Sequence, residues 1–462
     1  MRRLALVAVA ALACTSQTTN TEPGPLDGYF YPTGIGVLDR RLVVASSNAD
    51  LSYASDTGGS VIAADPCRPD PASPEVPSTC EVDPAVVTGA LNIQSFSGEI
   101  GVADPAACAE LTAAGKGASL LVPIRGVNLV YRLAADASGA LSCDGCDIGV
   151  GSSSHGDPFS VGIACGPGVA RAYVGYLRTT YGQTWLTQID LLKGPGETGY
   201  VRHWVLPDVS GQVRGFAYDA SLKRLYFTRT VSGSTTALLW LNLANGCLVD
   251  VANVQDGGCP FGLSRAGDVP AGLELRGIAL ANAAAVGGVR RAYVTARIYD
   301  AAQAAAAGGR VGDFDGLLLV VDLWEDVAGL LRFTIVDQIP IGYGAEEVRV
   351  LPERAGKRDV VVALAQDDGV LWVYDDETGE RVAVSRSPVT GAPLVGRTPG
   401  GLAVDPLRLA GNVVRVYVGS FQESFVTPID VPLDAPETAA IVTSGGEIRR
   451  IGPQLAQKAG TP

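Results

Sequence analysis

Short apolar runs recur along the chain, and three of them are almost the same: "RAYVGYLR" (171–178), "RAYVTARI" (291–298) and "RVYVGSFQ" (415–422). Each is rich in β-branched and aromatic residues, which is typical of a buried β-strand. Four further segments share the pattern. Seven such strands are therefore predicted, at 41–46, 119–124, 171–176, 224–229, 291–296, 359–364 and 415–420.

Each of these strands has an apolar partner on either side. In the upstream partner a Pro or Gly leads into a small apolar run, and the glycines suit an inner strand at a crowded axis. These partners lie at 32–39, 98–104, 158–164, 213–219, 275–281, 346–352 and 399–405. The downstream partner usually ends in Asp: 60–65, 128–134, 186–190, 238–243, 317–322, 369–375 and 426–430. A looser fourth strand follows in most units, for instance at 200–207 and 331–342.

Four short strands repeated seven times predict an all-β fold, a seven-bladed β-propeller of four-stranded antiparallel blades. Because one blade cannot bury its own faces, the ring is expected to form a single domain, over 26–453, followed by a C-terminal tail at 454–462. The pattern leaves the closure of the ring open. Residues 438–452 could supply one strand or two, and 27–31 could complete the last blade.

The N-terminus has the pattern of an export signal. Two arginines precede an apolar run that is too short to span a bilayer, so 1–13 is predicted to be a signal peptide. Its ending, "ALAC", resembles a bacterial lipobox, which implies that Cys14 is lipidated and that 14–25 is a flexible tether. The alternative is an ordinary cleaved signal followed by a chance cysteine.

The chain has nine cysteines, and an even set of eight remains once Cys14 is assigned to the lipid. An even set in an exported chain predicts disulfides. Spacing suggests two local pairs and leaves the other four to pair among themselves. The local pairs are Cys67 with Cys80 and Cys247 with Cys259, and the other four are Cys108, Cys143, Cys146 and Cys165.

Composition narrows the possible functions mainly by exclusion. The formal net charge of −13 argues against nucleic-acid binding, which usually needs a basic surface. Only two histidines are present, so a three-histidine zinc site is impossible. "CDGC" (143–146) lacks the histidine that follows a haem-attachment motif, and no nucleophile elbow or phosphate loop occurs. We expect no catalytic set, no metal and no cofactor.

One constellation of charged residues suggests a binding site. In propellers of this type, the entrances to the inner strands and the loops after the second strands share one face, around an axial funnel. The entrances carry Glu99, Arg214, Arg276 and Glu347, together with Thr33 and Glu346. The other loops carry Arg125, Arg178, Arg229 and Arg297. Arginine suits carboxylate, phosphate or sulfate, so an anionic ligand is expected; alternatively, these arginines keep loops soluble or pair with the glutamates.

The repeats resemble those of the YVTN-type β-propeller family, whose units read like Pro-x-Gly-Ile-Ala, Leu-Tyr-Val-x-Asn and Val-x-Val-Ile-Asp. "RAYVTA" (291–296), "PGGLAVD" (399–405) and "TPID" (427–430) match best, and the resemblance covers about 32–430. Where the family has Asn, the clearest copy has Ala296. The resemblance implies the fold. It says little about activity, because the family includes many uncharacterised binding proteins.

Three functions remain open. The first is a lipid-anchored, non-enzymatic binding or interaction scaffold of the cell envelope, with a protein or an anionic small molecule or saccharide as partner. The second is a funnel-sited hydrolase or lactonase, for which Glu99, Glu346 and Glu347 are the obvious acids. The third is a purely structural envelope protein. Thr15 after the lipid cysteine favours the outer membrane as the location, and the lipid anchor is the only expected contact with the membrane. We also expect the protein to be a monomer and not to bind nucleic acid.

Overall fold

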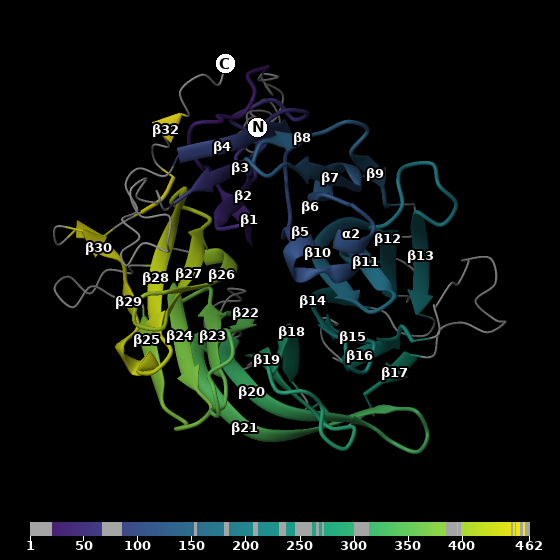
Figure 1. Cartoon of the computed structure of the whole chain (residues 1–462), viewed down its shortest axis with the longest axis vertical. Coiled ribbons are helices and arrows are strands. Elements are labelled where there is room, and N and C mark those ends of the chain that lie inside the picture. The colour runs from purple at the N-terminus through teal and green to yellow at the C-terminus, as the bar shows by residue number, and fades with distance from the viewer. Residues whose placement is uncertain are drawn as a thin grey trace, which may run out of the picture.

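The computed structural model of the chain describes residues 21–66, 86–151, 155–179, 184–206, 211–230, 237–244, 261–264, 268–269, 272–299, 314–384, 395, 399–444, 447–448, 450–452 and 456–457. Within these residues, seven small antiparallel sheets stand in a ring about a central axis (Figure 1). Almost all of the regular structure is strand, and the helices are single turns. The predicted all-β, seven-bladed propeller is confirmed.

The strands follow the predicted order, one blade after another. Blade 1 contains β1 (Pro32–Leu38), β2 (Arg41–Ser46), β3 (Gly59–Asp65) and β4 (Val86–Ile93). Blade 2 contains β5 (Gly101–Ala103), β6 (Ala118–Ile124) and β7 (Leu129–Ala135), with β8 (Leu141–Ser142) and β9 (Asp147–Gly149) both paired to β7. Blade 3 contains β10 (His155–Gly166), β11 (Val169–Thr179), β12 (Thr184–Asp190) and β13 (Val201–Leu206).

Blade 4 contains β14 (Gln212–Asp219), β15 (Arg224–Thr230), β16 (Ala237–Asn242) and β17 (Phe261–Leu263). Blade 5 contains β18 (Leu273–Leu280), β19 (Arg290–Tyr299), β20 (Phe314–Glu325) and β21 (Leu331–Tyr343). Blade 6 contains β22 (Ala345–Val350), β23 (Val360–Ala365), β24 (Val370–Asp375) and β25 (Arg381–Val384). Blade 7 contains β26 (Pro399–Leu409), β27 (Val413–Ser420), β28 (Phe425–Pro432) and β29 (Ala440–Ile441).

The register shows which loops share a face. In blade 1, Pro32 at the start of the inner strand pairs with Ser46 at the end of the second strand, and blade 7 repeats this with Pro399 and Ser420. Inner-strand entrances and second-strand exits therefore lie together on one face, as the sequence analysis assumed. We call this the funnel face, and the other the opposite face.

The repeated octapeptide is packing. Its tyrosines, on the second strands of blades 3, 5 and 7, are fully buried: Tyr173, Tyr293 and Tyr417. The apolar clusters lie between neighbouring blades. For example, Leu186 and Trp204 of blade 3 belong to the same buried cluster as Phe227 and Leu239 of blade 4. The blades thus cover each other's apolar faces, because no blade could do so alone.

Glycines let the inner strands approach one another closely at the axis. A Cβ placed on Gly215 of β14 would lie 2.7 Å from the carbonyl oxygen of Arg276 on β18. A Cβ on Gly277 of β18 would in turn lie 2.7 Å from the carbonyl oxygen of Glu346 on β22. Since backbone cannot move aside as a side chain can, these positions exclude any side chain.

The two ends of the chain meet where the ring closes. Residues 27–31 lead into β1, and they do not complete the last blade, whose fourth strand is β29. Ile451 exchanges two backbone hydrogen bonds of 2.8 Å with Val426 of blade 7, and Tyr29 donates its N–H to Gly452 at 3.0 Å. Beyond these, β32 (Ala456–Gln457) pairs in parallel with β4 of blade 1, so residues 451–452 and 456–457 tie blade 7 to blade 1.

Several short elements lie outside the seven blades. They are η1 (Pro105–Ala107), α2 (Ala109–Ala113), η2 (Arg125–Val127), η4 (Pro436–Thr438) and the hairpin of β30 (Thr443–Ser444) with β31 (Glu447–Ile448). None of the helices in the described part of the chain is long and apolar enough to cross a membrane.

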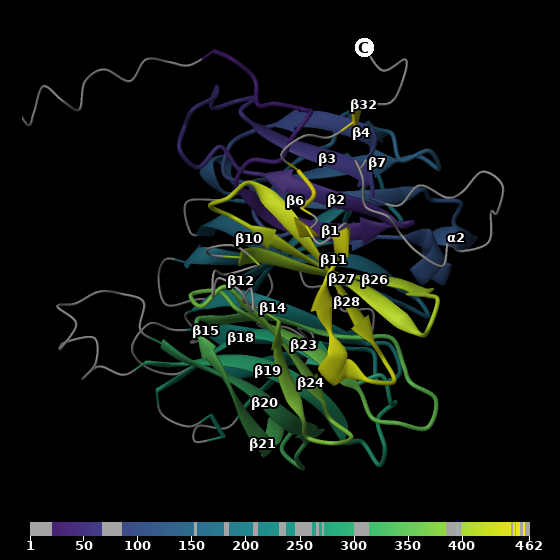
Figure 2. The same cartoon turned by 90° about the vertical axis from the view of Figure 1, so that its left-hand side faces the viewer.

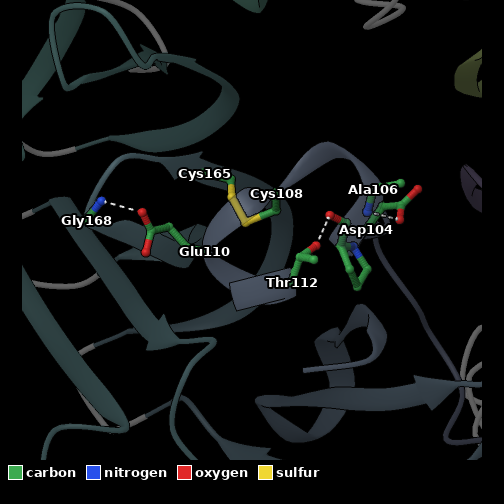
Figure 3. The surroundings of a disulfide bond; sticks show 8 residues. Asp104, Ala106, Cys108, Glu110, Thr112, Cys165 and Gly168 are labelled. Atoms are coloured by element: carbon green, nitrogen blue, oxygen red, sulfur yellow. Dashed lines mark hydrogen bonds between the residues drawn. A yellow bond between two sulfur atoms is a disulfide. The ribbon is translucent and has the colours of Figure 1, made fainter. Parts of the chain in front are cut away.

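The four cysteines left over by spacing do pair among themselves. Cys108, at the start of α2, is bonded to Cys165 at the end of β10, with Cα atoms 5.5 Å apart (Figure 3). Glu110 adds a hydrogen bond of 2.8 Å from the Gly168 N–H, so the α2 segment is fixed to blade 3. Cys143 is bonded to Cys146. The remaining predicted positions lie outside the described residues: Cys14, Cys67, Cys80, Cys247 and Cys259.

Replacing Gly215 by Ala is expected to lower the free energy of unfolding by about 1–3 kcal/mol, because its Cβ would collide with the backbone of β18. The matched control is Gly117→Ala, at an exposed position where a Cβ would meet nothing within 4 Å. Urea unfolding followed by tryptophan fluorescence measures both. Equal stabilities for the two variants would contradict the close approach at the axis.

Candidate functional site

A cavity of about 270 Å³ lies on the axis, between the inner strands. Its walls come from β10, β14, β18 and β22 of blades 3 to 6, with Glu99 reaching in from the entrance to β5. The apolar lining includes Val161, Ile163, Phe216 and Ile278. Six charged side chains also line it: Glu99, Arg214, Arg276, Glu346, Glu347 and Arg349.

Four of the eight predicted funnel residues line this cavity, and they are the four at inner-strand entrances: Glu99, Arg214, Arg276 and Glu347. The fifth, Arg297, lies just behind the wall. It is buried, donates its Nε–H to the Ala345 carbonyl at 2.9 Å, and forms an ion pair with Glu346.

The other three predicted arginines do not line the cavity. Arg125 forms an ion pair of 2.6 Å with Asp157, and its guanidinium lies 5.6 Å from the centre of the Phe159 ring. Arg178 is exposed near the end of β11. Arg229 is buried on β15, where burial lowers the pKa of its guanidinium to about 10. All three belong to second strands or their exits, one strand further from the axis.

Arg349 also lines the cavity, although it is not among the residues predicted from the sequence. Its spacing of two residues from Glu347 could have identified it. Residues two apart on a strand share a face, so a strand that turns Glu347 toward the axis also turns Arg349 there. The Arg349 guanidinium donates to the Glu347 carboxylate at 2.7 Å. The same spacing recurs on the neighbouring inner strands, where Arg276 donates to Glu274 at 2.8 Å and Arg214 to Gln212 at 2.9 Å.

The arginines of the cavity wall are only partly satisfied. The Nε atoms of Arg214 and Arg276 are buried and have no hydrogen-bond partner among the residues that the structure describes. Arg214 lies 3.9 Å from Glu346, which is an ion pair at the limit of contact, and its guanidinium is 5.3 Å from the centre of the Phe159 ring. A buried N–H without a partner is costly, so these groups would gain from an acceptor in the cavity.

The three glutamates have different protonation tendencies. Burial raises the pKa of Glu347 to about 7, against the opposing effect of Arg349. Burial also raises the pKa of Glu99 well above its usual value, and the nearby Glu347 carboxyl adds to this rise. Burial alone would also raise the pKa of Glu346. The guanidinium groups of Arg276, Arg297 and Arg214 outweigh this effect and hold the pKa of Glu346 below its usual value.

The lining holds three arginines and three glutamates, and the raised pKa values of Glu99 and Glu347 shift its charge toward positive. The pKa of Arg214 is lowered by burial, but only to about 10, so its guanidinium stays charged. The lowered pKa of Glu346 favours its carboxylate form, beside the arginines. The site can therefore accept a small anion, while a neutral carboxyl can also donate a hydrogen bond. Within the described residues, no three His, Cys, Asp or Glu side chains gather as they would to hold a metal ion.

Comparison with known proteins leaves the family of this chain open. No protein-family model matches the chain, and no curated protein matches its sequence. Among solved structures, it is similar to a Lactobacillus plantarum protein, with 13% identity, 79% of this chain and 86% of that chain covered, and a TM-score of 0.46.

Two further similar structures are of proteins whose names state a function. The BP39L lectin from Burkholderia pseudomallei is 11% identical over 93% of this chain and 100% of its own, with a TM-score of 0.45. The periplasmic gluconolactonase PpgL of Pseudomonas aeruginosa is 16% identical over 78% of this chain and 86% of its own, with a TM-score of 0.40. Similarities this low carry no argument about the ligand or activity of the present chain.

The raised pKa of Glu347 predicts a pH dependence of stability. A carboxyl whose pKa is higher in the folded chain than in the unfolded chain binds more protons when folded, so stability falls as pH rises from about 4.5 to about 7. Glu347→Gln removes this titration. Between pH 5 and pH 8, the free energy of unfolding of the wild type should therefore fall relative to that of the variant.

The matched control for this measurement is Glu437→Gln, at an exposed position in η4. Urea titrations at each pH give the difference between each variant and the wild type. A difference for Glu347→Gln that stays constant from pH 5 to pH 8 would contradict the proposed titration.

Proposed function

We propose that this chain is an exported lipoprotein, similar to YVTN-type propellers, whose axial cavity binds a small anionic ligand. The observation that carries the proposal is the pair of partly unsatisfied guanidinium groups, Arg214 and Arg276, in the wall of the axial cavity. The raised pKa values of Glu99 and Glu347 shift the charge of the cavity toward positive, which favours an anion over a neutral or cationic ligand.

The size of the cavity limits the ligand. At about 270 Å³ it is slightly smaller than the roughly 300–1,000 Å³ of pockets that hold drug-sized molecules. A single sugar ring or an organic acid of similar size fits this volume, and an oligosaccharide would have to extend out of it. The ligand is therefore a small molecule or the terminal unit of a larger one.

The mixture of polar groups limits the ligand further. Guanidinium groups match a carboxylate, whereas the carboxyl groups of Glu99 and Glu347, whose pKa values are raised by burial, can hydrogen-bond to hydroxyl groups. A hydroxylated acid, such as an aldonic or uronic acid, presents both kinds of group. We propose this class of ligand.

The N-terminal sequence supports a location of the protein in the cell envelope. The signal pattern of 1–13 and the lipobox-like "ALAC" support export and a lipid on Cys14. Thr15 supports the outer membrane as the destination. Mass spectrometry of the N-terminal peptide from the native membrane would test the lipid directly.

The binding proposal is tested by calorimetry with galacturonate, gluconate and neutral galactose. An acid should bind more tightly than galactose, and Arg214→Ala or Arg276→Ala should weaken it about tenfold or more, because each removes a charge-assisted hydrogen bond. Arg41→Ala serves as the matched control: this arginine pairs with Asp39 at the start of β2, on the opposite face.

Two results would contradict the binding proposal. One is equal affinity for galactose and the acids, and the other is unchanged affinity in both funnel variants. If none of the three compounds binds, a purely structural role in the envelope becomes the better hypothesis.

Hydrolysis is the second candidate, and one observation favours it. Glu99 and Glu347 have raised pKa values while the neighbouring Glu346 has a lowered one. Carboxyl groups whose pKa values are separated in this way can act as general acid and general base. A lactone of a sugar acid would suit both the cavity and this chemistry.

The hydrolytic alternative predicts turnover of gluconolactone above the rate in buffer, followed by NMR. Glu99→Gln and Glu347→Gln should each lower that rate by at least tenfold, since a positioned acid or base typically contributes about 10²–10⁴. Arg41→Ala is again the control. Wild-type protein that leaves the buffer rate unchanged while still binding gluconate would exclude this candidate and retain the first.

A further inference from the structure

The N-terminal segment joins the propeller at the funnel face. The carbonyl of Glu22 accepts a hydrogen bond of 2.8 Å from the Ala54 N–H, and the Gly24 N–H donates to Thr57 at 3.0 Å. Both partners belong to the loop between β2 and β3, on the funnel face. Asn92, near the end of β4, donates to the Gly24 carbonyl at 2.9 Å.

This attachment is close-packed as well as hydrogen-bonded. A Cβ on Gly24 would lie 2.4 Å from the Gly58 carbonyl and 2.8 Å from the ring of Phe30. The segment 22–24 is therefore fitted onto blade 1. Figure 2 shows the same arrangement from the side: α2 lies on the right, on the opposite face, and the purple N-terminal segment enters on the left.

The length of the tether then limits how far the funnel face can lie from the lipid. Cys14 and Glu22 are eight residues apart, so the chain between them spans at most about 29 Å when fully extended. An acyl group on Cys14 would hold the funnel-face edge of blade 1 within this distance of a bilayer. The opposite face could be near the membrane only if the tether ran back along the whole side of the ring.

We infer that the tether turns the funnel face toward the bilayer, so that the inner-strand entrances, which carry Arg214 and Arg276, face anionic groups at the membrane surface. This inference rests on the proposed lipidation of Cys14. It deepens the proposed function, because it names the bilayer surface as the partner that presents the ligand.

The side chains around the funnel suit such a surface. Leu51, Val127 and Tyr343 project from separate loops or strand ends of this face and are 46%, 47% and 43% exposed. Arg178 is exposed between them in the ring, and the Arg125 side chain is 38% exposed. Apolar and cationic side chains together favour the interface of a membrane that contains anionic lipids. Valines are also exposed on the opposite face, so it is the tether that selects the funnel face.

The orientation can be measured by energy transfer to the membrane. The mature chain, beginning at Cys14, is coupled through that cysteine to a maleimide lipid in vesicles of phosphatidylcholine and phosphatidylglycerol that also carry an acceptor dye. A donor dye is attached to azidophenylalanine, placed either at Val127 on the funnel face or at Val327, in the turn between β20 and β21 on the opposite face. Transfer from position 127 should be clearly the more efficient.

A variant with a long Gly/Ser insert after Asn20 is the control, and it should lose most of the difference between the two positions. Equal transfer from both positions with the native tether, or more from 327, would overturn the inference. A difference that persists with the insert would overturn it as well, by removing the tether as the cause. Because the coupling is chemical, the result does not depend on lipidation in the cell, which the mass spectrometry of Cys14 tests separately.

Discussion

The close approach of the inner strands at the axis is the constraint on which the rest of this molecule depends. Seven blades can share one axis only if their innermost backbones nearly touch, and Gly215 and Gly277 permit this by having no side chain. The blades then cover each other's apolar faces, and the tyrosines of the second strands become fully buried. The same geometry leaves a cavity of about 270 Å³ on the axis, lined by residues of four inner strands.

The electrostatics of the cavity depend on the position of its charged side chains on the inner strands. Arginines and glutamates on inner strands are removed from water, which is costly unless they are paired. Pairs two residues apart on one strand meet part of this cost, as in Arg276 with Glu274 and Arg349 with Glu347. Burial also favours the neutral forms of Glu99 and Glu347, which shifts the balance of charge toward the arginines. A binding site for anions can therefore exist inside a protein whose net charge is −13.

The alternative interpretation of these arginines, as partners of acidic residues, also holds for several of them. Arg125 pairs with Asp157, and Arg297 pairs with Glu346. Pairing and binding are compatible, because a guanidinium has five N–H donors and one carboxylate uses at most two of them. Arg214 and Arg276 combine an unsatisfied Nε atom with a position in the cavity wall.

The sequence by itself determined the blades, because a buried strand is marked by a short run of β-branched and aromatic residues and by local turn residues. It also identified the inner-strand entrances and so the four predicted residues that line the cavity. Only the tertiary structure decided which other arginines line the cavity. Arg349 is included, whereas Arg125, Arg178 and Arg229 lie one strand further from the axis. The tertiary structure also decided that Cys108 pairs with Cys165, because the start of α2 lies beside the end of β10, although the two cysteines are 57 residues apart in the sequence. Convergence about an axis is a property of the closed ring, and no local pattern of residues specifies it.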